Sequence, residues 1–302
     1  MLKTAVLTGQ ESSATMPATH PVISIGMPVY NGAAHLAQAL ESLLAQNFTC
    51  FEIIVSDNCS TDATPRIIAE YAARDARIRA IRQPENIGGL PNFRFVLKAA
   101  AGSFFMWAAY DDWHDPNYLE ALHGALAADA GLQMAAPRIV RMRMDGTIAG
   151  IAQMPLPGDK SRIRRVLAML SHSAGGMFYG LYRRQAINAA FDRAERDFPH
   201  IWAADHMTML PFFVNDQMVG VPQTSFYNRE TGISAGRYRP RTAAQLWPFL
   251  RSFLRFFVQE VRQSRLSAWE KAICLAYLPV YSNGKAVKWR RLLARAGGKE
   301  TG

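Results

Sequence analysis

Short apolar runs alternate with amphipathic stretches along the first half of the chain. The run VISIGMPVY at residues 22–30 is followed at 33–46 by apolar residues at helical spacing, which predicts a strand and then a helix. The unit recurs, with strands predicted at 51–57, 78–83 and 103–112, helices at 63–76, 90–102 and 116–127, and a further strand at 132–140. Strands that alternate with helices predict an α/β fold with a doubly wound, mostly parallel sheet flanked by helices.

The second half of the chain follows a different pattern. Beyond about residue 145 the alternation gives way to a section rich in Gly and Pro, and residues 243–296 are rich in Trp, Phe, Leu and Arg. We therefore expect a flexible N-terminal tail at 1–20, a main domain at 21–242 and a C-terminal amphipathic helical region at 243–302.

Composition limits the class of protein and of partner. The 302 residues are 49% apolar and 19% charged, which excludes a disordered or fibrous chain and allows one large core or two modest domains. The formal net charge of +10 favours an anionic partner, which could be nucleic acid, a phospholipid surface or a phosphorylated small molecule.

Neither the cysteines nor the apolar runs indicate a secreted or membrane-spanning protein. Cys50, Cys59 and Cys274 are odd in number and lack a CxxC spacing, so we expect no disulfide framework and no zinc site. No apolar stretch reaches the roughly 18 residues that a spanning helix needs. A cytoplasmic setting fits these features best.

Acidic residues end two of the predicted strands, and sheets of this class bind ligands at the carboxyl ends of their strands. Asp111 and Asp112 come directly after an apolar run. Mg²⁺ or Mn²⁺ takes one or two protein carboxylates and completes its shell with water and substrate phosphates, so the Asp pair is a candidate diphosphate-metal site. The alternative is that one Asp caps the helix that begins near Asp115 and Pro116.

Asp57 ends the second predicted strand, and Tyr30 and Asn31 follow the first. A carboxylate can accept a hydrogen bond from a nucleobase while an aromatic ring stacks on it. The alternative is ordinary turn chemistry at Asn31-Gly32 and an Asx-turn at Asp57. The residues alone leave both interpretations open.

Four segments in order resemble the successive blocks of family 2 glycosyltransferases of GT-A fold: PVYNGAAHLAQALESLLAQ, EIIVSDNCSTDAT, RQPENIGGLPNFRFVLKAAAG and YDDWHDPNYLE. Their order and spacing over residues 22–123 make the resemblance specific. It implies a GT-A type sheet and an inverting transfer of a sugar from a nucleotide-diphosphate sugar. The nucleotide-binding half would be 21–123 and the acceptor-side half 124–242.

The resemblance also implies roles for individual residues. Binding of the nucleotide sugar falls to Pro28, Tyr30, Asn31, Asp57, Asn86, Asp111, Asp112, Gly180, Arg229 and Ser234. Asp111 and Asp112 jointly would hold the divalent metal, Mg²⁺ or Mn²⁺. Asp205 lies where family members carry a Glu-Asp pair before an apolar helix, so it is the expected general base, with helix capping as the alternative. For Gly180 the alternative is tight packing.

The chain departs from the family pattern in the second and fourth blocks and before the expected base. The family's DDGSTDGT run is DNCSTDAT here, with Asn58 for Asp and Cys59 for Gly. Ala109 stands at the first carboxylate of the DxD motif, and Ala204 precedes the expected base. A catalytically degenerate, nucleotide-sugar-binding relative is therefore an alternative to an active enzyme.

Other classes are less well supported by the motifs. A nucleotidyltransferase that makes a nucleotide sugar would carry a Gly-rich basic loop after the first strand, and PVYNGAAH has none. A dinucleotide-binding oxidoreductase would carry GxGxxG there. No nucleic-acid-binding motif accompanies the positive charge, so we expect no nucleic-acid partner.

The C-terminal region offers two interpretations. Trp247, Phe249, Phe253, Phe256 and Phe257 recur at helical spacing among arginines. This face either packs on the main domain or lies on a membrane surface. A peripheral membrane contact through 243–296, at the inner face of the plasma membrane, would suit a lipid-linked acceptor. We expect transfer to a saccharide or lipid-linked acceptor in cell-surface polysaccharide synthesis.

Overall fold

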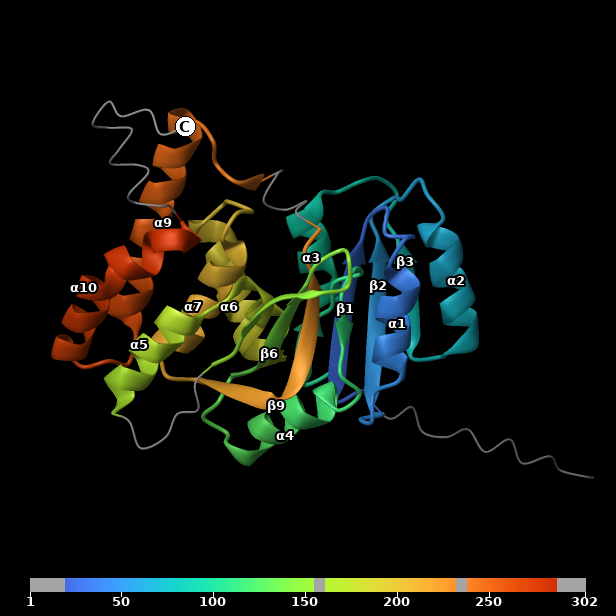
Figure 1. Ribbon diagram of the computed structural model, residues 1–302, viewed down its shortest axis with the longest axis horizontal. Helices are drawn as coiled ribbons and strands as arrows, with labels where there is room; N and C mark the ends of the chain where they lie inside the picture. The colour runs from blue at the N-terminus through green and yellow to red at the C-terminus, as the bar shows by residue number, and fades with distance from the viewer. Residues whose placement is uncertain (1–19, 155–160, 232–237, 287–302) are drawn as a thin grey trace, which may run out of the picture.

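A nine-stranded sheet organises the part of the chain that the structure describes, which is residues 20–154, 161–231 and 238–286 of a computed structural model (Figure 1). The strands are β1 (Ile23–Val29), β2 (Phe51–Asp57), β3 (Ile78–Arg82), β4 (Phe104–Trp107), β5 (Trp113–His114), β6 (Met134–Met142), β7 (Ile148–Ala152), β8 (Leu181–Arg183) and β9 (Met218–Arg229). The helices are α1 (Leu36–Leu44), α2 (Thr64–Arg74), α3 (Gly89–Lys98), α4 (Tyr118–Ala128), α5 (Arg162–His172), the 3₁₀ helix η1 (Gly175–Tyr179), α6 (Arg184–Asp197), α7 (Ala204–Val214), α9 (Ala243–Gln263) and α10 (Ala268–Lys285).

The first half of the sheet is wholly parallel, as the alternation of strands and helices predicts. Its order is β3-β2-β1-β4. The register places Val29 opposite Asp57 and Asp57 opposite Arg82. Three strands therefore reach their carboxyl ends at the same edge, which is where a ligand of such a sheet binds.

The second half of the sheet is mixed. The order continues β8-β6-β9-β5, with β8 antiparallel to both β4 and β6. The longest pairing there, between β6 and β9, is parallel, and β5 joins β9 in the antiparallel sense. The predicted α/β fold with helices on the sheet is confirmed.

Pro28 lies inside a central strand, where proline normally removes a ladder hydrogen bond. Pairing of β1 with β4 ends at Gly26 opposite Trp107, and the amide of Ala108 donates the last bond to the Gly26 carbonyl (2.9 Å). Alternate residues of a strand face the same neighbour, so Pro28 faces the side on which β4 has already ended. Its missing N–H therefore costs no bond.

The strand expected at 103–112 is shorter than predicted, because β4 ends at Trp107. The chain turns over Tyr110 and Asp111 and then forms the two-residue strand β5. The ring of Tyr110 occupies the space beside Gly32, where an added Cβ would lie 2.6 Å from Tyr110 Cδ2. Asp111 and Asp112 therefore lie in a loop between two strands and not on the end of a strand.

The C-terminal region forms the predicted helix pair over its described residues, α9 and α10. Phe249, Phe253, Phe256 and Phe257 are at most 1% exposed. Phe249 packs against Phe198 of the segment after α6, with ring centroids 5.6 Å apart. Each such burial contributes about 1.5–3 kcal/mol. For these four residues the structure shows packing on the main domain, and only Trp247 of the predicted face is exposed (60%).

None of the described helices is long and apolar enough to cross a membrane. The expected N-terminal tail and residues 287–302 lie outside the described ranges.

Candidate active site

Asp57 presents an unsatisfied acceptor at the carboxyl edge of the sheet. Its side chain is 2% exposed, and Oδ1 accepts from the amide of Ser60 (3.0 Å). Oδ2 is buried and accepts no hydrogen bond from the described residues, although Arg82 Nη1 lies 3.2 Å away. A buried oxygen without a donor is costly, so this atom is suited to receive one from a ligand.

Tyr30 and Asn31 lie beside Asp57 but differ in what they do. Tyr30 is 38% exposed directly after β1, which leaves its ring accessible. Asn31 adopts a left-handed φ of 51°, and its Oδ1 accepts from the amide of Thr61 (2.9 Å). Asn31 thus ties the first sequence block to the second, as turn chemistry predicts.

The departure at Asn58 has a structural reason. Its Nδ2 donates to Asn86 Oδ1 (2.9 Å) and to the Gly88 carbonyl (3.2 Å), while its Oδ1 accepts from the amide of Ile87 (2.9 Å). An aspartate could not make the two donated bonds. Asn58 and Asn86 therefore fasten the loop between β3 and α3 at the same edge.

The other departure in this block is sterically less favourable. Cys59 has a φ of 61°, in the left-handed region where glycine has no Cβ penalty. The turn has kept the glycine conformation although the residue has changed.

Asp112 is fully engaged inside the protein. Its side chain is 2% exposed, Oδ1 accepts from the amide of Arg229 (2.7 Å), and Oδ2 accepts from Asn228 Nδ2 (3.0 Å). Burial and the neighbouring charge of Asp111 raise the pKa of Asp112 to about 7. Asp112 therefore fastens the loop after β4 to the end of β9.

Asp111 is the more available carboxylate of the pair. No other described residue donates a hydrogen bond to its carboxylate oxygens. Burial raises the pKa of Asp111, and the charges of His35 and Arg229 act in the opposite direction. A carboxylate with few hydrogen bonds is a suitable ligand for a divalent ion that is also held by phosphates.

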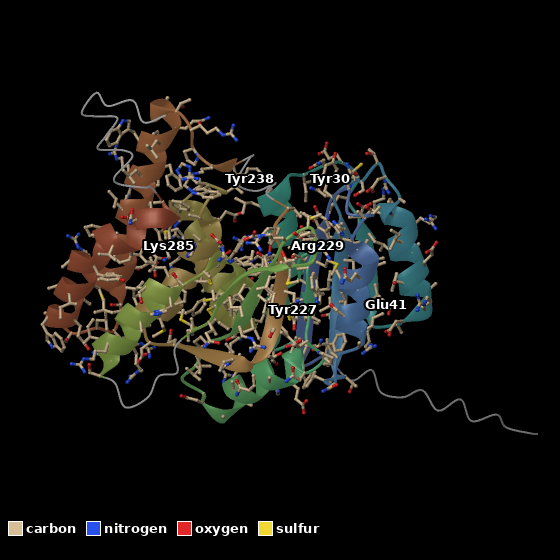
Figure 2. All side chains as sticks on the ribbon, viewed as in Figure 1. Tyr30, Glu41, Tyr227, Arg229, Tyr238 and Lys285 are labelled. Carbon is tan, nitrogen blue, oxygen red and sulfur yellow. The ribbon has the colours of Figure 1, made fainter. Side chains whose placement is uncertain are left out.

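Arg229 joins three elements at this point, and Figure 2 shows it near the middle of the molecule. Its guanidinium donates to the Asp111 carbonyl and to Gln38 Oε1 of α1 (2.7 Å), and it lies 4.9 Å from the centroid of the Trp113 ring. Arg229 therefore lies beside Asp111, and its contact with a nucleotide sugar stays a prediction. Ser234 lies outside the described residues.

Asp205 lies in the first turn of α7, facing η1. Its Oδ1 accepts from the amide of His206 (2.8 Å), and its Oδ2 lies so close to Gly175 that an added Cβ would be 2.4 Å away. The preceding Ala203 has a φ of 66°, which an L-residue adopts at a cost of roughly 1–2 kcal/mol. The backbone at the start of α7 is thus held in an unfavourable conformation next to the expected base.

The hydroxyl of the partly buried Tyr179 is influenced by the charges of both carboxylate regions. Burial raises the pKa of its hydroxyl well above the ordinary value, and the charges of Asp112, Asp111 and Asp205 add to the shift. The charges of all three carboxylates therefore act on the Tyr179 hydroxyl.

Gly180 has a packing role. An added Cβ would lie 2.4 Å from the carbonyl oxygen of Ala135 on β6. This close backbone approach accounts for glycine at the position, as the packing alternative expects. Its contact with a sugar stays a prediction.

Three site residues escaped the sequence prediction. Arg82 pairs with Asp57, His35 acts on Asp111, and Asn228 holds Asp112. Arg82 could have been found, because it ends the third predicted strand. Nothing in the sequence signals that His35 or Asn228 would come near the Asp pair.

A comparison with known families decides the class of the protein. The profile described as Glycosyl transferase family 2 matches residues 24–201, more than half of the chain. The chain belongs to this family. Asp205 and the C-terminal helices of this family 2 glycosyltransferase lie beyond the matched residues.

Curated relatives share only part of their length with the glycosyltransferase. An uncharacterized protein of Mycobacterium bovis is 46% identical over 91 residues, which is 29% of this chain and 26% of that protein. EpsH of Bacillus subtilis is 30% identical over 175 residues, covering 56% of this chain and 49% of EpsH. The chain thus matches about a quarter to a half of these relatives.

Solved structures confirm the GT-A type fold. The crystal structure of S. aureus TarS superposes with a TM-score of 0.64 at 18% identity, covering 87% of this chain and 43% of that one. Mannosyltransferase PcManGT from Pyrobaculum calidifontis, in complex with GDP-Man and Mn²⁺, gives a TM-score of 0.50 at 15% identity, covering 93% and 81%. At these identities the likeness concerns the fold alone.

Proposed function

We propose that this glycosyltransferase moves a sugar, with inversion, from a nucleotide-diphosphate sugar to a saccharide or lipid-linked acceptor. The observation that carries the proposal is the buried Oδ2 of Asp57, which lies beside the exposed ring of Tyr30. This oxygen is ion-paired with Arg82 (3.2 Å) but accepts no hydrogen bond from the described residues. A nucleobase supplies both the missing donor and a surface for stacking. S. aureus TarS, which has a similar fold, has been crystallised with UDP-GlcNAc.

A divalent metal fits the loop after β4. Among the described residues no cluster of three or more His, Cys, Asp or Glu could hold an ion by itself. Mg²⁺ and Mn²⁺ at a diphosphate need only one or two protein carboxylates. Asp111 would therefore be the direct ligand, and the neighbouring Asp112 would support the loop that carries it. A metal bound there would stabilise the negative charge on the departing diphosphate. The complex of PcManGT with Mn²⁺ agrees with this assignment.

Asp205 is the proposed general base. As the acceptor hydroxyl oxygen forms its bond to the anomeric carbon, the bond from that carbon to the diphosphate oxygen breaks, and the hydroxyl proton passes to the Asp205 carboxylate. Attack opposite to the leaving group inverts the anomeric centre. The guanidinium of Arg229, fixed beside Asp111, adds positive charge near the diphosphate.

Release of nucleoside diphosphate tests the donor site. The protein is incubated with Mn²⁺ or Mg²⁺ and a panel of nucleotide sugars, and release is followed over time. Asp57→Asn replaces the buried acceptor with a donor, and we expect about 10- to 100-fold weaker binding of the preferred donor. Glu85→Gln, an exposed carboxylate in the neighbouring loop, serves as the matched control and should bind normally.

The base requires a separate experiment. Asp205→Asn should bind the donor normally while transfer falls by about 10²- to 10⁴-fold. Equal loss of binding and transfer would assign Asp205 to structure. Metal-dependent binding without any release across the panel would identify a degenerate relative, and absence of both would overturn the proposal.

The acceptor and the pathway are proposed on chemical grounds. A growing cell-surface polysaccharide on a lipid carrier would bring acceptor hydroxyls to Asp205 at the cytoplasmic face of a membrane. A cell-free assay with membrane extracts as acceptor should then incorporate labelled sugar into lipid-extractable material.

A further inference from the structure

One face of α10 is apolar and exposed. Trp269, Ile273 and Val280 are 58%, 38% and 58% exposed, and their spacing places them on the same side of the helix. Further exposed apolar residues on that side are Ala272, Ala276 and Pro279. The opposite side of α10 is already buried through Cys274 and Tyr281, so the exposed face is not needed for packing. In Figure 1, α10 forms one end of the molecule along its longest axis.

The solvent-facing charges of the α9 and α10 hairpin are all positive. Arg251, Arg255, Arg262 and Arg265 are exposed. The two acids of residues 243–286 are Glu260 and Glu270, and each is 4% exposed. Arg193 of α6 pairs with Glu260 (3.1 Å), and Arg162 of α5 donates to Glu270 through Nε (3.1 Å). No exposed acid of the hairpin's own described residues compensates these cations, although Asp197 of α6 interacts electrostatically with Arg255.

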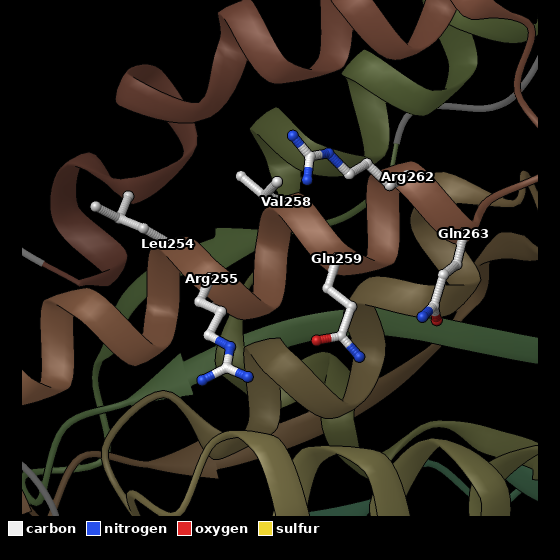
Figure 3. A pocket seen from close by; sticks show the side chains of 6 residues that line it. All are labelled: Leu254, Arg255, Val258, Gln259, Arg262 and Gln263. Atoms are coloured by element: carbon white, nitrogen blue, oxygen red, sulfur yellow. The ribbon is translucent and has the colours of Figure 1, made fainter.

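A groove along α9 is lined by both apolar and positively charged side chains (Figure 3). Its volume is about 470 Å³, and its lining residues are Leu254, Arg255, Val258, Gln259, Arg262 and Gln263. Figure 3 shows Arg255 and Arg262 projecting to opposite sides of the helix. Asp197, whose carboxylate accepts from Gln259, is already paired with Arg196 (2.8 Å). The groove thus offers guanidinium groups beside aliphatic side chains.

We propose that the α9 and α10 hairpin docks on an anionic membrane surface. Trp269, Ile273 and Val280 enter the boundary between headgroups and acyl chains, and Arg255 and Arg262 contact lipid phosphates. Tryptophan with aliphatic neighbours beside arginine is the composition of a helix that lies in this boundary. The surface is distinct from the phenylalanine face of α9, which is buried in the protein.

A second copy of the chain fits the face less well. A two-fold interface places the same patch on both subunits, so the arginines of one hairpin would meet those of the other. Like charges brought together oppose association, whereas anionic lipid neutralises them. Tyr281 and Lys285 of α10 interact electrostatically with Asp205, but neither belongs to the exposed apolar face or to the groove along α9. Vesicle binding and sugar transfer can therefore be measured independently.

Vesicle flotation tests the proposal with the full chain. We expect flotation with phosphatidylcholine vesicles that contain phosphatidylglycerol, weaker flotation at high salt, and none with phosphatidylcholine alone. Trp269→Ala with Ile273→Ser and Val280→Ser should weaken binding at least about tenfold. Arg255→Gln with Arg262→Gln should weaken it roughly thirtyfold, since each cation near an anionic surface contributes about fivefold.

Two matched controls lie elsewhere on the molecule. Ile148→Ser with Ile151→Ser removes side chains of similar exposure (56% and 57%) from β7. Arg66→Gln with Arg74→Gln removes two exposed cations from α2, at the opposite end of the molecule in Figure 1. Both controls should float like the unaltered protein.

Three results would overturn the proposal. These are no flotation of the unaltered protein with anionic vesicles, an equal loss of flotation in either control, and a dimeric mass in solution that Trp269→Ala converts to a monomer. Urea midpoints equal to that of the unaltered protein establish that each variant is folded.

Discussion

The carboxylate of Asp205 accounts for glycine at position 175. A methyl group there would meet Oδ2 at 2.4 Å and displace the carboxylate. We expect Gly175→Ala to lower transfer by 10²-fold or more, because a shift of about 1 Å at a catalytic group has this effect. Donor binding should be unchanged. The assay compares transfer with donor affinity.

The control for this prediction is Gly124→Ala on α4, where an added Cβ has nothing within 4 Å. It should leave transfer unchanged and stabilise the protein slightly, because alanine is the better helix former. Normal transfer in Gly175→Ala would remove Asp205 from the role of base.

Asp112 makes stability depend on pH. The unfolded chain holds this carboxyl near its ordinary pKa of about 4, whereas burial and Asp111 raise the folded value to about 7. Between these pH values the native state binds a proton that the unfolded state releases, so stability falls as pH rises, by up to about 1.4 kcal/mol per pH unit. Urea unfolding in the presence of a chelator measures this slope.

Asp112→Asn supplies the comparison for the pH slope. The amide cannot titrate, so the stability difference between the two proteins should narrow as pH rises from about 4 to 7. The variant also loses one of the two acceptors for Asn228 and Arg229, which lowers its stability at every pH. Parallel pH profiles would show that Asp112 keeps an ordinary pKa in the folded protein.

At the residue scale, the sequence predicted which acidic residues lie at the edge of the sheet better than it predicted their hydrogen-bond partners. Asp57 and Asp111 were found because they follow apolar runs, and parallel strands end at a common edge. The sequence could not predict that Asp112 is hydrogen-bonded inside the protein while Asp111 remains available. This difference depends on Asn228 and Arg229, which lie 116 and 117 residues beyond Asp112.

At the scale of elements, α9 offers two aromatic side chains in contrasting environments. Phe253 is fully buried and packs on Tyr281 of α10 with ring centroids 5.9 Å apart, whereas Trp247 is 60% exposed. We expect Phe253→Ala to lower the free energy of unfolding by about 3–5 kcal/mol. Trp247→Ala should change it by no more than about 0.5 kcal/mol. Urea unfolding of both variants measures the contrast, and similar losses would contradict the assigned packing of α9.

The same helix shows why the C-terminal prediction stayed open. Aromatic residues at helical spacing look alike in a sequence whether they face lipid or protein. The distinction came from Phe198 and Tyr281, which cover the stripe from distant parts of the chain. Similarly, the apolar run before Asp111 looks like one long strand, but β4 ends where its pairing with β1 ends at Trp107.

At the scale of the whole molecule, the fold class was predictable, and the parallel half of the sheet more readily than the mixed half. Buried strands followed by amphipathic helices indicated the parallel half directly. The mixed half depends on short strands such as β8, whose three residues carry little periodic signal. Among the described residues, one hydrophobic cluster includes residues from Ile23 to Ala286, and the expected boundary at residue 242 stays a prediction.

Asn228 and Arg229, at the end of β9, hold Asp112 through two hydrogen bonds, and this clamp affects the order in which the protein folds during synthesis. A nascent chain that has emerged only to residue 123 contains β1 to β5 but lacks Asn228 and Arg229, which fasten the loop bearing Asp111. Because synthesis proceeds from the N-terminus at about 5–20 residues per second, the parallel strands are available some seconds before this clamp. The proposed nucleobase site at Asp57 can therefore form early in synthesis, whereas the proposed diphosphate site at Asp111 is completed only after β9 has been made.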